Sequence, residues 1–149
     1  MKKHYAFLCC LAVSLALFTA GCKKKVKPLS ERIAKAWTAE AVKHGTTSVY
    51  ARGGSGNSVP GYSNFRLNLT GASNAAVYTE WDNNTFSGTW ELQGDSKLIL
   101  RGLTPQPSGT GGTVEFDIIS IDDSKLVIKN VNPSKKTGDT INEYTLTNP

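Results

Sequence analysis

Apolar and polar residues alternate along most of the chain after residue 64, and this period of two is typical of half-buried β-strands. In residues 65–70, for example, Phe65, Leu67 and Leu69 share one face and polar residues occupy the other. Turn-forming residues such as Gly, Asn, Asp and Ser separate the segments. The predicted strands are residues 46–52, 65–70, 75–82, 86–92, 97–101, 114–118, 126–131 and 141–147.

The connections between these strands are only a few residues long and show no helical crossover pattern. Sequential strands joined in this way form antiparallel neighbours. The sequence therefore predicts an all-β fold, an antiparallel up-and-down sheet of about eight strands that closes into a barrel or folds into a sandwich.

The segment before the strands predicts a short N-terminal helix. Ser30 is a plausible N-cap, and Ile33 and Trp37 stand at helical spacing. Beyond Trp37 the alanines favour helix whereas the alternation favours strand, and we expect a short helix that yields to a strand ending near His44. The Gly-rich residues 53–61 predict a flexible loop.

The first 22 residues have the pattern of a lipoprotein signal peptide. A charged start precedes the apolar residues 6–20, a run too short to span a bilayer, which needs roughly 20 apolar residues. Ala20 and Gly21 resemble the site cleaved by lipoprotein signal peptidase, where the thiol of Cys22 takes a diacylglyceryl group and becomes the new N-terminus. We expect three parts: a signal peptide (1–21), a basic linker after lipidated Cys22 (22–28) and a folded domain (29–149). The alternatives are an ordinary secretory signal or a buried apolar helix.

The positive charge of the chain is concentrated near this predicted anchor. The formal charge is +5, but six of the 17 Lys and Arg residues precede Leu29, whereas all 12 Asp and Glu residues follow it. The predicted domain therefore carries 11 cationic and 12 acidic side chains, which is no nucleic-acid signature. The lysines after Cys22 would contact anionic lipid head groups or form a soluble spacer. Because residues 23–25 are basic and not acidic, we expect an anchor that faces the periplasm, and because residue 23 is not aspartate, we expect it at the outer membrane of the cell envelope.

The predicted mature chain has few residues that could form a catalytic or metal-binding motif. Cys22 is its one cysteine and His44 its one histidine, so neither a disulfide framework nor a metal site is expected. Residues 53–56 lack the lysine of a phosphate-binding loop, and Ser55 lacks the Gly-x-Ser-x-Gly frame. We expect a protein without enzymatic activity, cofactor or metal.

Two short motifs give the chain a family resemblance. A lead-in ends at Trp37, and the hairpin at residues 88–100 reads Gly-x-Trp-x-Leu, a turn, then Lys-Leu-x-Leu. The apolar residues 126–128 also follow directly after a turn that contains Asp and Ser. With these features the sequence resembles the lipocalin-like domains of small bacterial lipoproteins, although Lys35 stands two places before Trp37 where true lipocalins have glycine. The resemblance implies an eight-stranded lipocalin-like barrel with a short N-terminal helix.

A barrel of eight strands encloses an interior just wide enough for packed side chains or one small ligand. The large apolar residues of the strands are predicted to form a plain core: Phe65, Leu67, Leu69, Trp90, Leu92, Leu98, Leu100, Phe116 and Ile118. Four aromatic residues near loops are the predicted ligand-binding residues, because exposed aromatic rings stack on sugars or cover apolar ligands: Tyr50, Tyr62, Tyr78 and Trp81. We expect binding of a small hydrophobic ligand or a glycan. The alternative is a structural or inhibitor-like protein that contacts partners through residues 53–61 and 104–112.

Overall fold

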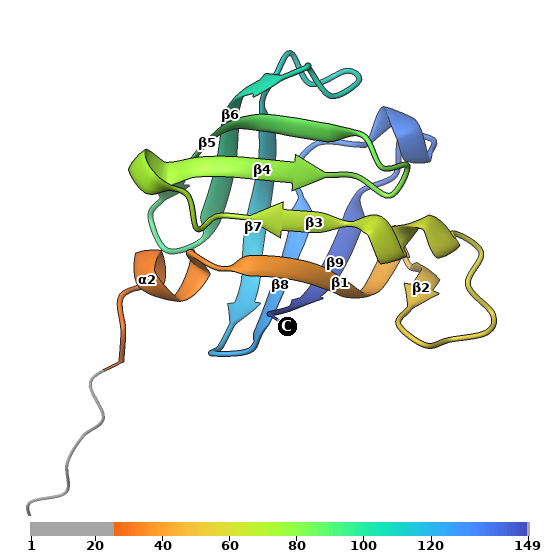
Figure 1. Ribbon diagram of the computed structural model, residues 1–149. Helices are drawn as coiled ribbons and strands as arrows, with labels where there is room; N and C mark the ends of the chain where they lie inside the picture. Colours follow the sequence, from red (N-terminus) through yellow and green to blue (C-terminus); the bar gives the residue numbers. More distant parts are fainter. Residues whose placement is uncertain (1–25, 149) are drawn as a thin grey trace, which may run out of the picture.

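The computed structural model describes residues 26–148, which form a β-barrel with one short α-helix at its N-terminal side (Figure 1). The predicted signal peptide and Cys22 lie outside the described residues. Among residues 26–148, no helix has the length and apolar character needed to cross a bilayer.

Nine antiparallel strands make up the sheet, and eight of them close the barrel. Each barrel strand pairs with its neighbour in sequence, and β1 pairs with β9 over Thr38 to His44 to complete the circle. The predicted eight-stranded up-and-down barrel is confirmed. The barrel strands are β1 (Ala36–His44), β3 (Arg66–Asn68), β4 (Ala75–Thr79), β5 (Thr85–Gln93), β6 (Lys97–Thr104), β7 (Val114–Ile121), β8 (Lys125–Asn130) and β9 (Asn142–Thr147).

The ninth strand, β2 (Thr47–Ala51), is not part of the closed circle of strands and pairs only with β1. It pairs with the second half of β1, beyond the point where β3 pairs with the first half. Residues 52–59 then lead to a 3₁₀ turn, η2 (Pro60–Asn64), which brings the chain back to β3. The alternating pattern predicts this short strand. It does not predict that β2 stays outside the barrel while β3 continues the circle beside β1.

Large apolar side chains from every barrel strand fill the interior. Phe65, Leu67, Leu98, Leu100 and Phe116 have no solvent exposure, and Leu69 and Trp90 are also buried. Leu92 and Ile118 are partly buried and pack against this core. The predicted plain core is therefore confirmed, and most of the barrel interior is packed protein.

The N-terminal helix, α2 (Leu29–Ile33), closes one end of the barrel. Ile33 and Trp37 are fully buried there, and the Trp37 indole donates a hydrogen bond of 2.9 Å to the Ile33 carbonyl. Arg32 donates to the carbonyl of Ile121 at 3.1 Å, which joins the helix to the end of β7. These contacts make α2 an apolar plug.

One local prediction at this end is wrong: Ser30 lies inside α2 and the N-cap is Pro28, whose missing N–H costs nothing at a helix start. The predicted short helix that yields to a strand ending near His44 is confirmed, since the helix ends at Ile33 and β1 runs from Ala36 to His44. The pairing of β1 with β3 and β9 on its two edges overrides the helix propensity of its alanines.

The face of β4 that points into the barrel is not the face that its sequence pattern predicts. In the sequence, Val77, Thr79 and Trp81 alternate on one face of this segment, which the pattern predicts to be the apolar face, yet Val77 is 38% exposed. Ala76 and Tyr78 point inward and are buried. This register matters for function because it places the Tyr78 phenol inside the barrel.

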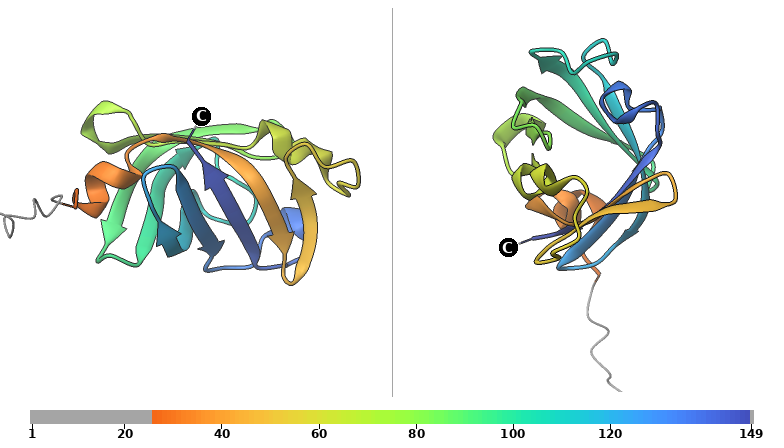
Figure 2. Two further views of the ribbon diagram at one scale, coloured as in Figure 1. Left: turned by 90° about the horizontal axis from the view of Figure 1, so that it is seen from below. Right: turned by 90° about the vertical axis from the view of Figure 1, so that its right-hand side faces the viewer.

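The two ends of the barrel are built differently (Figure 2). One end carries α2 and the turns between β5 and β6 and between β7 and β8. The other end, which we call the mouth, carries the β4–β5 turn, the β6–β7 loop and residues 131–141. This last segment contains the 3₁₀ turn η4 (Lys135–Thr137), drawn in blue in Figure 2 at the opposite end from the orange α2.

Candidate functional site

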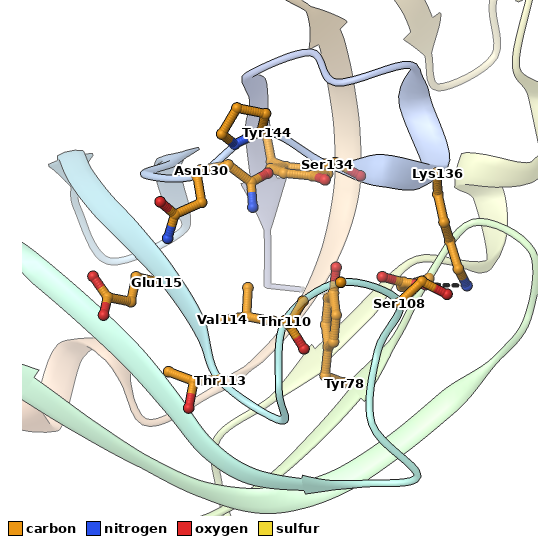
Figure 3. A pocket seen from close by; sticks show the side chains of 14 residues that line it. Tyr78, Ser108, Thr110, Thr113, Val114, Glu115, Asn130, Ser134, Lys136 and Tyr144 are labelled. Carbon is orange, nitrogen blue, oxygen red and sulfur yellow. Dashed lines mark ion pairs between the residues drawn. The ribbon is translucent and has the colours of Figure 1, made fainter.

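A cavity of about 130 Å³ opens at the mouth of the barrel (Figure 3). Four parts of the chain form its wall: the end of β4, the β6–β7 loop with the start of β7, the segment that runs from the end of β8 through η4, and Tyr144 of β9. The lining residues are Tyr78, Glu80, Ser108, Gly109, Thr110, Thr113, Val114, Glu115, Asn130, Asn132, Pro133, Ser134, Lys136 and Tyr144.

The volume sets the class of ligand that fits. A cavity of about 150 Å³ holds one benzene-sized ring. Pockets for drug-sized ligands run from roughly 300 Å³ upward. A cavity of about 130 Å³ therefore fits one six-membered ring, or one unit of a larger molecule that continues into solvent.

Two phenols form the inner wall of the cavity. Tyr78 from β4 and Tyr144 from β9 are both buried, and their rings extend into the aromatic core around Phe65 and Phe116. Burial raises the pKa of Tyr78, and burial raises the pKa of Tyr144 to about 12. Both side chains are thus neutral hydroxyl groups at physiological pH.

A buried amide holds the segment around η4 in place. Asn142, at the start of β9, is 1% exposed, and its amide nitrogen donates to Thr137 at 3.1 Å and to the Tyr144 hydroxyl at 3.3 Å. Its carbonyl oxygen accepts from Thr140 at 2.7 Å and from Thr137 at 3.2 Å. The Asn142 amide therefore links η4 to the Tyr144 phenol on the inner wall of the cavity.

Lys136 bridges two sides of the mouth. Its ammonium group reaches from η4 to the β4–β5 turn, where it lies 2.7 Å from Asp82 Oδ2 and pairs with Glu80 (Figure 3, dashed line). The side chains of Lys136 and Glu80 are 18% and 14% exposed. The ammonium group also lies over the Phe86 ring. Because Lys136 and Glu80 are largely removed from water, the Coulomb attraction between them is stronger than in a surface ion pair.

The pKa values in this triad shift with burial and pairing. Burial raises the pKa of Glu80 and outweighs its hydrogen bond to Lys136. For Asp82 burial acts in the same sense, but the hydrogen bonds from Lys136 and Asn84 dominate and lower its pKa. Burial acts to lower the pKa of Lys136, yet its bonds to Asp82 and Glu80 outweigh that effect and raise it. The ammonium group is therefore held in its charged form.

The remaining wall is neutral and rich in hydrogen-bonding groups. Asn130 Oδ1 is buried and has no hydrogen-bond partner among the described residues. Leaving such an acceptor unsatisfied costs about 1–3 kcal/mol, so the site calls for a donor from water or from a ligand. Thr110, by contrast, uses its hydroxyl within its own loop, where it donates to Pro107 at 2.9 Å.

Gly109 lets the β6–β7 loop approach η4 closely. Its φ is +75°, and a Cβ atom at this position would lie 2.7 Å from Cγ of Lys135. Only glycine combines this left-handed backbone with so short an approach. The two loops therefore meet beside the cavity and narrow its entrance.

No protein-family model matches the chain, and no curated protein matches it significantly. The structure is similar to the crystal structure of a lipocalin-like protein from Bacteroides uniformis, with a TM-score of 0.50 and 14% sequence identity. The similarity covers 79% of this chain and 99% of that one. The chain has a lipocalin-like fold. At this level of identity the likeness concerns the path of the chain, so the ligand must be argued from the mouth itself.

The lipocalin-like barrel brings three of the four predicted ligand-binding residues to its mouth. Tyr78 lines the cavity of about 130 Å³. Tyr62 and Trp81 line a second hollow of about 10 Å³, which has room for about one water molecule. Tyr50 packs behind Tyr62, with ring centroids 6.1 Å apart, and lines neither of these two spaces.

The predicted exposure of these four aromatic rings is wrong in part. Exposed rings were expected, but Tyr50, Tyr62 and Tyr78 are each less than a tenth exposed. Trp81 is half-buried, and its indole nitrogen has no hydrogen-bond partner within residues 26–148. These residues therefore act as the base of the mouth of the lipocalin-like barrel and not as a stacking platform on its surface.

His44 belongs to the same end of the barrel. Its Nε2 lies 2.7 Å from the Tyr62 hydroxyl, and burial lowers its pKa. No serine or carboxylate joins this pair in the hydrogen bonds of residues 26–148, and no group of three or more potential metal ligands occurs among those residues. The contact fixes the Tyr62 ring against the aromatic core.

The sequence pattern did not indicate most of the polar residues at the mouth of the lipocalin-like barrel. Glu80, Asn130, Lys136 and Asn142 were not among the predicted site residues. A signal for two of them was present, since Asn130 and Asn142 occupy inward positions on their strands, Asn142 on the same face as Tyr144 and Leu146. A polar residue on the core face of a strand marks either a partnered group or a site.

Proposed function

We propose that this protein is a binding module of the cell envelope that takes one sugar unit of a glycan into the mouth of its lipocalin-like barrel. The cavity of about 130 Å³ between β4, the β6–β7 loop and η4 is the observation that carries the proposal. Its size fits a single six-membered ring, and its wall presents amide, hydroxyl and phenol groups.

The same observations favour a glycan over a hydrophobic ligand. The interior below the cavity is filled by Phe65, Leu67 and Phe116, so an acyl chain has no space to enter. Asn130 Oδ1 needs a hydrogen-bond donor, which a sugar hydroxyl provides and a hydrocarbon does not. Tyr78 and Tyr144 add apolar ring surface beside their hydroxyl groups, a combination that suits a sugar.

The predicted lipid anchor agrees with this placement of the site. The described chain begins at Val26 and enters α2, which lies at the end of the barrel opposite the mouth. A protein tethered through Cys22 would present its mouth away from the bilayer. We propose attachment to the outer membrane on its periplasmic side, where the mouth reaches envelope glycans, and a binding role without catalysis or cofactor.

Binding and lipidation can be tested separately. Titration calorimetry of the soluble domain with solubilised envelope glycan fragments should show saturable binding. Asn130→Ala should weaken it by about five- to tenfold, the equivalent of about 1 kcal/mol for one lost hydrogen bond. The control is Lys129→Gln, because Lys129 is exposed on the outer face of the same strand. Equal loss in both variants, or no binding at all, would contradict the proposal.

Mass spectrometry of the mature protein tests the anchor. We expect a first residue at Cys22 that carries acyl groups. An unmodified N-terminus elsewhere would remove the membrane from the proposal and leave the mouth as a site of a soluble protein.

A partner protein is the second candidate for the same end of the molecule. Residues 104–112, one of the two loops considered for protein contacts, form part of the cavity wall and are largely exposed. A structural or inhibitor-like role would therefore use the mouth too. Shortening residues 53–58, which lie outside the cavity wall, should leave glycan binding intact, and loss of a protein contact in the same variant would favour this second candidate.

A further inference from the structure

We infer that the mouth selects an uncharged sugar unit and rejects acidic ones, because Lys136 is an internal counter-ion of the cavity wall and not a ligand-binding cation. This inference rests on the proposed glycan-binding function and specifies the ligand of the same site. Lys136 is thereby assigned as the residue that sets the charge specificity of the pocket.

Lys136 is the only cationic side chain among the residues that line the described cavity, so an acidic ligand would have to use it. Its ammonium group already pairs with two carboxylates, Glu80 and Asp82. One of the three N–H donors of the ammonium group is directed to Asp82, and Glu80 is its second ion-pair partner. A ligand carboxylate would have to displace one of these partners and leave it without a counter-ion in a largely buried position.

The carboxylates of the wall are likewise paired. Glu80 faces Lys136, and Glu115 pairs with Lys97 at 3.6 Å on the neighbouring strand. Asp82 stands outside the lining and shares the same ammonium group. Each charge that faces the cavity therefore has a partner from the protein, and the groups left for the ligand are neutral ones such as Asn130.

Bringing an unpaired charge into the cavity is costly, whereas the hydroxyl groups of a sugar ring can form hydrogen bonds with neutral polar groups of the wall. Burying a charge without a counter-ion costs more than burying a neutral polar group that gains a hydrogen bond. Specificity then follows from the groups that would be left unpaired with the wrong ligand. The same reasoning disfavours a cationic ligand, since it must compete with Lys136 for Glu80.

A matched series of three probes tests this inference: methyl glucoside, glucuronate and glucosamine, each titrated into the protein at neutral pH and followed by NMR. Wild type should bind methyl glucoside at least about tenfold more tightly than either charged probe. Glu80→Gln, which preserves the shape of the side chain, removes one partner of Lys136. It should raise the affinity for glucuronate by about tenfold, as one new charge-assisted hydrogen bond would.

The neighbouring lysine is the matched control. Lys135 is exposed, pairs with Asp139 at 2.8 Å and does not line the cavity, so Lys135→Gln should leave all three affinities unchanged. Lys136→Met should remove the gain when combined with Glu80→Gln, which shows that the ammonium group receives the acid.

The outcomes separate the inference from the proposed function. Tighter binding of glucuronate or glucosamine than of methyl glucoside by wild type would overturn the inference while the glycan-binding function stands. An unchanged glucuronate affinity in a folded Glu80→Gln variant would also overturn it. Absence of binding by all three probes, together with the absence of binding to envelope glycan fragments, would overturn the proposed function and this inference with it.

Discussion

The two ends of this barrel are closed by different chemistry. At the α2 end, Ile33 and Trp37 are fully buried, and the Trp37 indole donates a hydrogen bond to the Ile33 carbonyl. At the mouth, the chain buries an amide, two phenols and a lysine–carboxylate cluster, and it leaves a cavity of about 130 Å³. The apolar end is the form of closure that stability alone favours.

The difference shows where the barrel departs from a plain hydrophobic core. Buried polar networks are costly unless every member is satisfied, and Asn130 Oδ1 is not. Proteins depart from the rules of stable packing mainly at functional sites. The contrast between an apolar plug and a mouth that encloses a cavity and a buried charged cluster is therefore the physical basis for placing the site at the mouth.

The largest expected effect comes from removing the plug. Trp37→Ala should lower the free energy of unfolding by about 3–5 kcal/mol, since it empties a fully buried site and removes the bond to Ile33. Trp81→Ala, at the half-buried mouth, should cost clearly less. Urea unfolding followed by circular dichroism measures both. Equal losses would mean that the two ends contribute alike to stability.

Removing the amide at the mouth should have an intermediate effect. Asn142→Ala leaves Thr137, Thr140 and the Tyr144 hydroxyl without their shared partner, and we expect a loss of about 1–3 kcal/mol. Amide hydrogen exchange should rise in residues 131–141 and stay unchanged in α2. Faster exchange at α2 instead would show that the ends are not independent.

Glu80 and Asp82 should respond to pH in opposite directions. Burial raises the folded-state pKa of Glu80 above its ordinary value of 4.5, so its contribution to stability is present below that value and lost as pH rises through the raised pKa. Hydrogen bonds from Lys136 and Asn84 outweigh burial and lower the pKa of Asp82, so its contribution is present at neutral pH and lost as pH falls through the lowered pKa.

Two variants measure these contributions. Relative to wild type, Glu80→Gln should gain stability as pH rises from acidic to neutral, whereas Asp82→Asn should lose stability over the same interval. Denaturant unfolding at a series of pH values provides the comparison. Parallel curves for the two variants would contradict the assignment of opposite pKa shifts.

The smallest effect is expected for an ion pair on the outside of the barrel. Arg101 and Glu91 lie 2.6 Å apart, but both side chains are about half exposed. Exposed pairs contribute about 0–1 kcal/mol, so Glu91→Gln should change the unfolding free energy by no more than that and leave glycan binding unchanged. A larger loss would show that the charged outer face also holds the barrel together.

The strands and the core could be predicted from the sequence because their signals are local. The alternation of Phe65, Leu67 and Leu69 with polar residues follows directly from the pleat of a strand. β1 was less clear, since its alanines favour helix and two of its three strand partners come from residues 66–68 and 142–147. Local propensity does not contain such distant partners.

The mouth was predictable only in part. Tyr78 was recognised as a candidate, although the wrong face of β4 was expected inside. Glu80 and Lys136 are 56 positions apart and meet only because residues 131–141 fold over the β4–β5 turn. In sequence each looks like an ordinary charged surface residue. The polar inward positions of Asn130 and Asn142 were the local signs of a buried site.

The most direct test of the account is the location of binding. In an amide NMR titration with methyl glucoside, the account predicts that shifts concentrate at the mouth, at Ser108, Thr110, Asn130 and Ser134, with the Asn130 side-chain amide among the largest. Signals of Leu29–Ile33 and Trp37 at the plug should stay in place. Shifts centred on α2 or on the outer face of the sheet, with the mouth unaffected, would contradict it.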